Sequence, residues 1–139
     1  KTEWTERFSV RLPDLAPAAY MIAEGDLNGD RRTDIAVLGK TATYLILQGE
    51  EGSMNPPQAL INTSAQLSLL QIADVNGDGR EDLSYQSTEG AARGLCARLQ
   101  KDNGRLGPEL RHRYRARSRD RYRSSSSRSL WKWASLVSL

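Results

Sequence analysis

Short apolar segments alternate with polar turns along residues 7–112. Each segment is about four to six residues long, is rich in aliphatic and β-branched residues, and is bounded by Gly, Pro, Asn or Asp. This punctuation is typical of strands and not of helices. The predicted strands cover residues 7–12, 19–23, 34–38, 43–47, 58–62, 69–73, 82–86, 94–99 and 109–112. The chain is therefore predicted to be all-β.

The order of these segments repeats. A polar nonapeptide occupies residues 26–34, and a second with the same pattern begins 48 residues later and occupies residues 74–82. Each follows one predicted strand and precedes three more. Four antiparallel strands in a period of about 48 residues fit one blade of a β-propeller. Residues 7–12 would then be the last strand of a preceding blade.

Both nonapeptides carry the chemistry of a calcium loop. Oxygen-bearing side chains stand at positions one, three, five and nine, where a tight coil brings them toward one point. These are Asp26, Asn28, Asp30 and Asp34 in the first loop and Asp74, Asn76, Asp78 and Asp82 in the second. The backbone carbonyls of Arg32 and Arg80, at position seven, would add a ligand to each. Calcium takes six to eight oxygen ligands, so the sequence predicts up to two structural Ca²⁺ ions.

Other features of the loops agree with a coil. Position two is apolar in both, and glycines at positions four and six permit a positive φ. In the first loop Arg31 replaces the second glycine and is expected to adopt that conformation itself. An EF-hand or a dockerin module would need an oxygen ligand at position twelve and flanking helices. That position holds Val37 or Tyr85. A polar turn without metal remains an alternative for each loop.

These loops resemble the FG-GAP, or VCBS-type, repeat of integrin α-subunit propellers and of many secreted bacterial proteins. The resemblance covers about residues 7–112, and residues 99–109 also resemble the hairpin between the third and fourth strands of such repeats. It implies an all-β propeller with calcium bound in inter-strand loops. Arg31 departs from the pattern, as does Ala73, which stands where the first repeat has Gly25. Two blades do not close a propeller, so a partial, incomplete propeller is expected.

Charge divides the chain into two parts. Residues 1–110 hold 11 Lys/Arg against 16 Asp/Glu, whereas residues 111–139 hold 9 Lys/Arg against one acid. The expected division is two blades with the last strand of a preceding one over 1–110, and a disordered or irregular basic tail over 111–139. Arginine occupies every second position from 111 to 123. Nucleic-acid binding, an anionic-surface anchor, or a tail foreign to the repeat are alternative interpretations.

Little in the sequence indicates catalysis. His112 lies among arginines, and Cys96 lies alone in a predicted strand as a structural thiol. A non-enzymatic module is therefore expected, secreted, periplasmic or on the cell surface, where calcium would saturate such sites. Its partner would be an extracellular protein or carbohydrate, with self-association through an exposed blade edge. An accessory domain of a secreted polysaccharide-active enzyme is the alternative. No apolar run is long enough for a transmembrane segment, and the start at Lys1 suggests a mature product or an excised piece.

Overall fold

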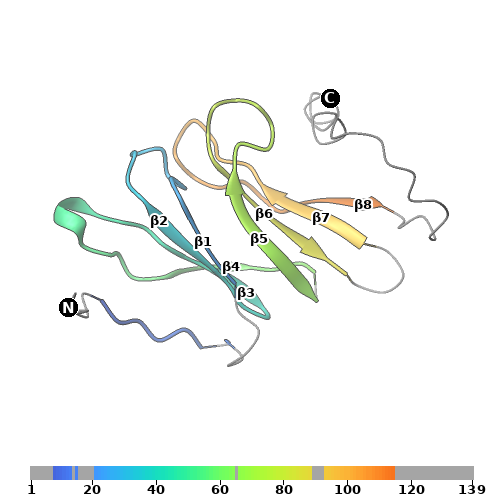
Figure 1. Cartoon of the computed structure of the whole chain (residues 1–139), viewed down its shortest axis with the longest axis horizontal. Helices are drawn as coiled ribbons and strands as arrows, with labels where there is room; N and C mark the ends of the chain where they lie inside the picture. Colours follow the sequence, from blue (N-terminus) through green and yellow to red (C-terminus); the bar gives the residue numbers. More distant parts are fainter. Residues whose placement is uncertain (1–7, 14, 16–20, 65, 89–92, 115–139) are drawn as a thin grey trace, which may run out of the picture.

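A computed structural model describes residues 8–13, 15, 21–64, 66–88 and 93–114. These residues form two four-stranded antiparallel sheets, each a meander in which consecutive strands are neighbours (Figure 1). The only helical element among them is a short 3₁₀ turn, η1 (Glu50–Gly52). The all-β prediction is confirmed, and the two sheets are consistent with two blades of a partial propeller. No helix in this described part is long and apolar enough to cross a membrane.

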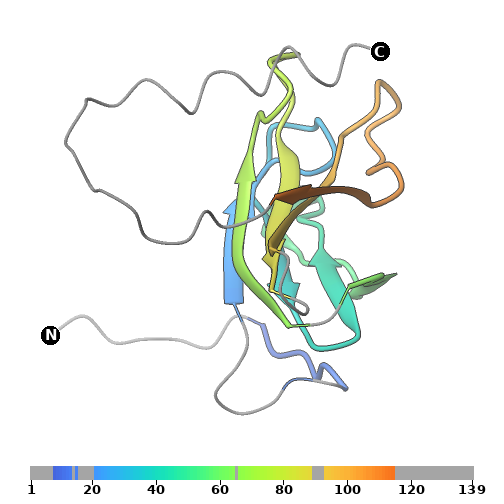
Figure 2. The same cartoon turned by 90° about the vertical axis from the view of Figure 1, so that its right-hand side faces the viewer.

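The strands follow the repeat. The first sheet contains β1 (Met21–Gly25), β2 (Asp34–Leu38), β3 (Ala42–Ile46) and β4 (Gln58–Ile61). The second contains β5 (Leu67–Ala73), β6 (Asp82–Ser87), β7 (Arg93–Arg98) and β8 (Leu110–Tyr114). The first strands of the two sheets, β1 and β5, lie side by side in both views (Figures 1 and 2).

The main core lies between the sheets. Alternate residues of β2, Ala36 and Leu38, face the second sheet, which contributes Leu83, Tyr85 and Cys96. The intervening residues of the first sheet face the other way and form a second cluster. Because β2 is covered on both faces, its apolar run is continuous and not alternating.

The second cluster is covered by the N-terminal segment. Val10 and Leu12 pack against this cluster, whose buried members are Val37, Ala42, Tyr44 and Ile46. The predicted strand over 7–12 is wrong for its described part, residues 8–12, which form no strand. No described strand edge pairs with this segment, so burial of its side chains holds it in place instead.

The last strand extends beyond the predicted boundary of the blades. β8 runs to Tyr114 and pairs with β7, so residues 111–114 of the expected tail belong to the second sheet. Alternating arginines are accommodated there because β8 is the last strand of its sheet and Arg113 is exposed. The other residues of that tail, 115–139, lie outside the described residues.

Candidate metal centre

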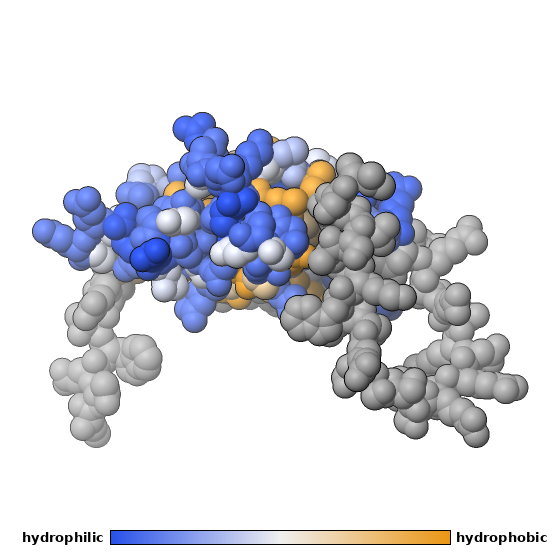
Figure 3. All heavy atoms as spheres, turned by 90° about the horizontal axis from the view of Figure 1, so that it is seen from above, coloured by the Kyte–Doolittle hydropathy of each residue, from blue (hydrophilic) through white to orange (hydrophobic). Residues whose placement is uncertain are grey.

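The two nonapeptides form equivalent loops at one end of the molecule. Loop 1 (residues 26–34) joins β1 to β2, and loop 2 (residues 74–82) joins β5 to β6 (Figure 1). Viewed from above, this end is dominated by hydrophilic residues (Figure 3). Each sheet also carries a hairpin near its loop: hairpin 1 (residues 48–54) is closed by a bridge from Gln48 to Met54, and hairpin 2 (residues 100–106) by one from Gln100 to Leu106.

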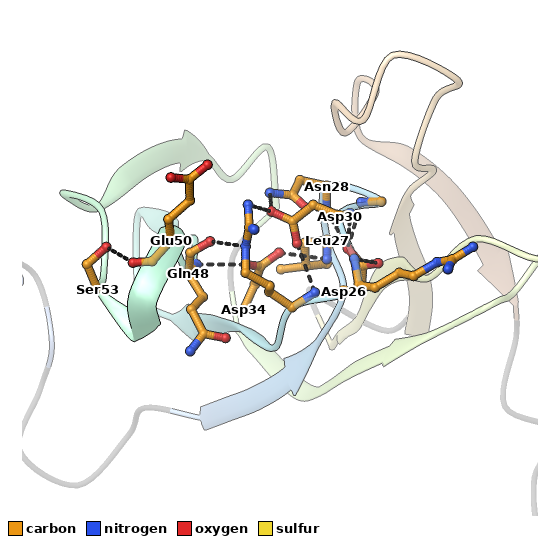
Figure 4. Close-up of polar contacts among 11 residues, drawn as sticks. Asp26, Leu27, Asn28, Asp30, Asp34, Gln48, Glu50 and Ser53 are labelled. Atoms are coloured by element: carbon orange, nitrogen blue, oxygen red, sulfur yellow. Dashed lines mark hydrogen bonds and ion pairs between the residues drawn. The ribbon is translucent and has the colours of Figure 1, made fainter.

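Loop 1 coils around the carboxylate of Asp26. This carboxylate accepts the backbone N–H groups of Gly29, Asp30 and Arg31 at 2.6, 3.1 and 2.7 Å (Figure 4). Oδ1 of Asn28 accepts the N–H of Asp30 at 3.0 Å, and a carboxylate oxygen of Asp30 accepts the N–H of Arg32 at 2.9 Å. The side chains at positions one, three and five thus organise the backbone of the coil, as short polar side chains do in turns.

Asp34, at position nine, fastens the loop to the sheet. It is fully buried, and its two oxygens accept the N–H groups of Leu27 at 2.9 Å and of Gln48 at 2.8 Å. Burial raises the pKa of Asp34, and the carboxylates of Asp30 and Asp26 raise it further by repulsion. Two other carboxylates therefore lie close enough to oppose the ionisation of Asp34.

Loop 2 repeats this geometry. The carboxylate of Asp74 accepts the N–H groups of Gly77, Asp78 and Gly79 at 2.7, 3.1 and 2.8 Å. Oδ1 of Asn76 accepts the N–H of Asp78 at 2.9 Å. Corresponding hydrogen bonds in the two loops differ by at most 0.2 Å, although the loops share only part of their sequence.

Asp82 repeats the role of Asp34. It is fully buried and accepts the N–H groups of Val75 at 3.1 Å and Gln100 at 2.8 Å. Burial raises its pKa, as does repulsion from Asp78 and Asp74. Both loops therefore place one ionisable carboxyl inside the fold, next to two others.

The backbone conformation follows the predicted pattern. φ is 80° at Gly29, 79° at Gly77 and 84° at Gly79. Arg31, which replaces the second glycine of loop 1, has φ of 64°, as expected from its position. Residues with a side chain are strained there, by about 1–2 kcal/mol. The apolar residue at position two of loop 1, Leu27, is 1% exposed and joins the main core.

The side chains at position seven have a role that the sequence analysis did not assign. The guanidinium group of Arg32 lies 2.8 Å from the Asp30 carboxylate, and that of Arg80 lies 2.7 Å from Asp78. Their Nε atoms donate to the backbone carbonyls of Gln48 and Gln100, each at 3.2 Å. The sequence carried one sign of this role. Both loops have Arg at position seven, and both hairpins begin with a Gln that directly follows a Leu.

The donor set of each loop suits calcium chemically. Three carboxylates and an amide oxygen are hard ligands. Burial raises the pKa values of Asp34 and Asp82, and the neighbouring carboxylates add a smaller repulsion that a cation would relieve. Within the described residues, however, no three acidic, His or Cys side chains form a compact group around a single point. The outer oxygens of Asp30 and Asp78 face the arginines. The calcium-ligand assignment therefore stays a prediction. It requires the ion to take the place of the Arg32 guanidinium at Asp30 and of the Arg80 guanidinium at Asp78.

A second polar cluster, also missed from the sequence, lies under β8. The side chain of Glu109 is 2% exposed and accepts hydrogen bonds from the N–H and hydroxyl groups of Thr63, at 3.2 and 2.5 Å, and from the hydroxyl of Tyr85. The guanidinium group of Arg98 lies 3.5 Å away. Burial alone would raise the pKa of Glu109, but these donors and the arginine together lower it. The cluster joins the linker between the sheets to β6, to β7 and to the residue that precedes β8.

Cys96 is fully buried, in agreement with a structural thiol. It lies 3.8 Å from the hydroxyl of Ser64, and burial raises its pKa. A raised thiol pKa reduces the thiolate that a nucleophile needs.

Comparison with known families supports the repeat assignment. Residues 26–84 match a family model described as an FG-GAP-like repeat. The match begins at the first residue of loop 1 and ends within β6, so it includes the whole of both loops. No curated protein and no solved structure gave a match.

Proposed function

Because the chain contains an FG-GAP-like repeat and repeats its loop with the same hydrogen bonds 48 residues later, we propose that it is a non-enzymatic calcium-binding module of β-propeller type. The observation that supports this best is the equivalence of loops 1 and 2. Each gathers oxygen side chains at positions one, three and five around one coil, and buries the carboxyl at position nine. Asp26, Asn28, Asp30 and Asp34 would hold one ion with the carbonyl of Arg32, and Asp74, Asn76, Asp78 and Asp82 a second with that of Arg80.

The role of the metal would be structural. Asp34 and Asp82 each lie between repelling carboxylates in an interior that raises their pKa values. A divalent cation cancels this repulsion and fixes the connection between the first two strands of each sheet. Calcium would have to displace the contacts that Arg32 and Arg80 make with Asp30 and Asp78. Both arginines are partly exposed, so they can turn to solvent at small cost.

A site at the weak end of known calcium affinities would be saturated at extracellular calcium concentrations, and this supports a secreted, periplasmic or cell-surface location. The module would then contribute to recognition of a protein or carbohydrate, with self-association through an exposed blade edge. An accessory domain of a secreted polysaccharide-active enzyme is the second candidate, because the same repeat would serve it equally well. Nucleic-acid binding would depend on the arginines of the tail, most of which lie outside the described residues.

The test is a thermal unfolding curve followed by circular dichroism, first in EGTA and then with calcium. At about 100-fold excess over Kd, one site adds about 2.7 kcal/mol to the free energy of unfolding. We expect a calcium-dependent rise in Tm that Asp78→Asn reduces. Asp102→Asn is the matched control. Asp102 also forms an ion pair with Arg80, but it lies on hairpin 2, outside loop 2, and its side chain is 93% exposed. An identical Tm with EGTA and with calcium would contradict the proposal, as would an equal response to magnesium.

A further inference from the structure

The second repeat holds both polar backbone atoms of Asp26. The N–H of Asp26 donates to Oε2 of Glu81 at 2.5 Å, and its carbonyl accepts from Nε2 of Gln100 at 2.8 Å. Asp26 supplies the first side chain of loop 1, and its carboxylate is the centre of the loop 1 coil. The position of that carboxylate therefore depends on residues of loop 2 and hairpin 2.

Gln100 contacts both loops at once. Its backbone N–H donates to the buried carboxylate of Asp82 in loop 2 at 2.8 Å, while its side chain reaches Asp26 in loop 1. The residue is 3% exposed, so water competes little for either hydrogen bond. A displacement of Asp82 would be transmitted to Asp26 through a single residue.

Close packing leaves little room for the two loops to move independently. A Cβ atom on Gly25 would lie 2.5 Å from both Ile72 Cγ2 and Glu81 Oε2. Gly104 of hairpin 2 contacts the carbonyl of Asn28 so closely that a Cβ would overlap it. Glycine at these two positions lets the second repeat lie directly against loop 1 (Figures 1 and 4).

Loop 2 lacks the same support within the described part of the chain. Asp74 is exposed, and no hydrogen bond joins its N–H or carbonyl to another described residue. Gln48 is the counterpart of Gln100, because its N–H makes the same bond, to Asp34. Its side chain, however, points away from loop 1 in Figure 4, and among the described residues it makes no hydrogen bond to loop 2. The pair Gln48 and Gln100 thus provides an internal control.

We propose that Gln100 and Glu81 are positioning residues that make cation binding in loop 1 depend on loop 2. This inference rests on the proposed calcium function. Binding in loop 2 orders Asp82 and Gln100, and these fix the Asp26 peptide in place for the first site. By linkage, binding in loop 1 strengthens loop 2 by the same factor, and couplings of this kind are typically about 5–150-fold.

The first experiment is isothermal calcium titration of the full chain and its variants. Asp74→Asn with Asp78→Asn disables loop 2 and leaves loop 1 to be measured. We expect this change to weaken loop 1 at least about five-fold when Gln100 is present, the lower end of typical coupling. In a background that combines Gln100→Met with Glu81→Ala, the same change should matter less than about two-fold, because both links to Asp26 have been removed. The control, Gln48→Met, should keep the five-fold effect.

The second experiment needs no metal. Amide hydrogen exchange at Asp26, measured by NMR in EGTA, should be about ten-fold faster in Glu81→Ala, which removes the acceptor of that N–H. Thr33→Ala is the control, since Thr33 occupies position eight of loop 1 as Glu81 does in loop 2. Equal exchange in both variants would overturn the inference.

The two proposals fail in different ways. Calcium binding to loop 1 that is unaffected by loop 2, or equally affected with and without the side chains of Gln100 and Glu81, overturns the positioning role and leaves the calcium function intact. A wild-type chain that binds no calcium overturns both proposals.

Discussion

The buried Glu109 cluster allows a quantitative test of what joins the two sheets. Substitution of Glu109 by Gln keeps its size and removes its charge. Arg98 is left with a side chain that is 9% exposed and no carboxylate partner, and its remaining acceptors are the carbonyls of Ile61 at 2.6 Å and Gly107 at 3.4 Å. Removing one partner of a buried ion pair typically lowers stability by about 3–5 kcal/mol, because the other charge stays buried and uncompensated.

We expect Glu109→Gln to fall in this range, which is a large fraction of the roughly 5–15 kcal/mol that stabilises a typical domain. The assay is urea unfolding followed by circular dichroism at 25 °C. The control is Asp102→Asn, which breaks a shorter ion pair of 2.9 Å whose carboxylate is 93% exposed. Exposed pairs contribute only about 0–1 kcal/mol. Burial and not distance should therefore decide the outcome.

The effect should also depend on pH. The pKa of Glu109 is lowered in the folded state, so its ionised form favours folding. This contribution is complete above the pKa that Glu109 has in the unfolded chain, and it is lost as pH falls through the lower, folded value. The difference between wild type and Glu109→Gln should therefore be constant near neutral pH and shrink in acid.

Two results would refute this reasoning. One is a cost of Glu109→Gln no larger than that of Asp102→Asn, and the other is a difference that does not change in acid. If Glu109→Gln is too unstable to measure, Tyr85→Phe tests the same cluster with the ion pair retained. It removes one hydrogen bond to a charged group, which is worth about 1.5–3 kcal/mol. A neutral result for that variant would show that the cluster does not hold the linker.

Three further predictions test the packing and the loops. Gly25→Ala should lower stability by about 1–3 kcal/mol in urea unfolding, because its methyl group would overlap Ile72. The control is Ala73→Gly at the equivalent position of the second repeat, which should cost no more than about 1 kcal/mol. Equal effects of the two changes would contradict the tight contact at Gly25. Arg31→Gly should raise stability by about 0.5–1 kcal/mol because φ is 64° there, whereas Gly79→Ala, at φ of 84°, should lower it. Cys96 should react with iodoacetamide at least about 100-fold more slowly in the native chain than in urea, because burial raises its pKa and excludes the reagent. Rapid labelling of the native chain would show that the main core is open.

The elements of this fold were predictable because their signals are local. Every predicted strand except the first, over residues 7–12, has a counterpart in the structure, and the observed bounds of β2 equal the predicted ones at residues 34–38. The loops were equally readable, since Asp and Asn side chains bond to backbone groups a few residues away. Even the strained φ of Arg31 followed from its alignment with Gly79.

The sequence could not indicate what each element contacts. Residues 8–12 have the composition of a strand, but a strand also needs a neighbouring edge, and that depends on the arrangement of the sheets. The ion pairs of Asp30 with Arg32 and of Asp78 with Arg80 likewise depend on which way the arginine side chains turn. Composition showed the charges and gave no information on their pairing.

The sequence by itself thus determined an all-β repeat with two coiled oxygen-rich loops, because turn chemistry and strand composition act over a few residues. Only the tertiary structure decided that Gln100 reaches Asp26, 74 residues away, and that Glu109 meets Thr63, 46 residues away. Those contacts arise where two sheets pack, and packing is set by the shape of the whole interface. A glutamine in a hairpin or a glutamate before a strand carries no sign of its partner until the sheets come together.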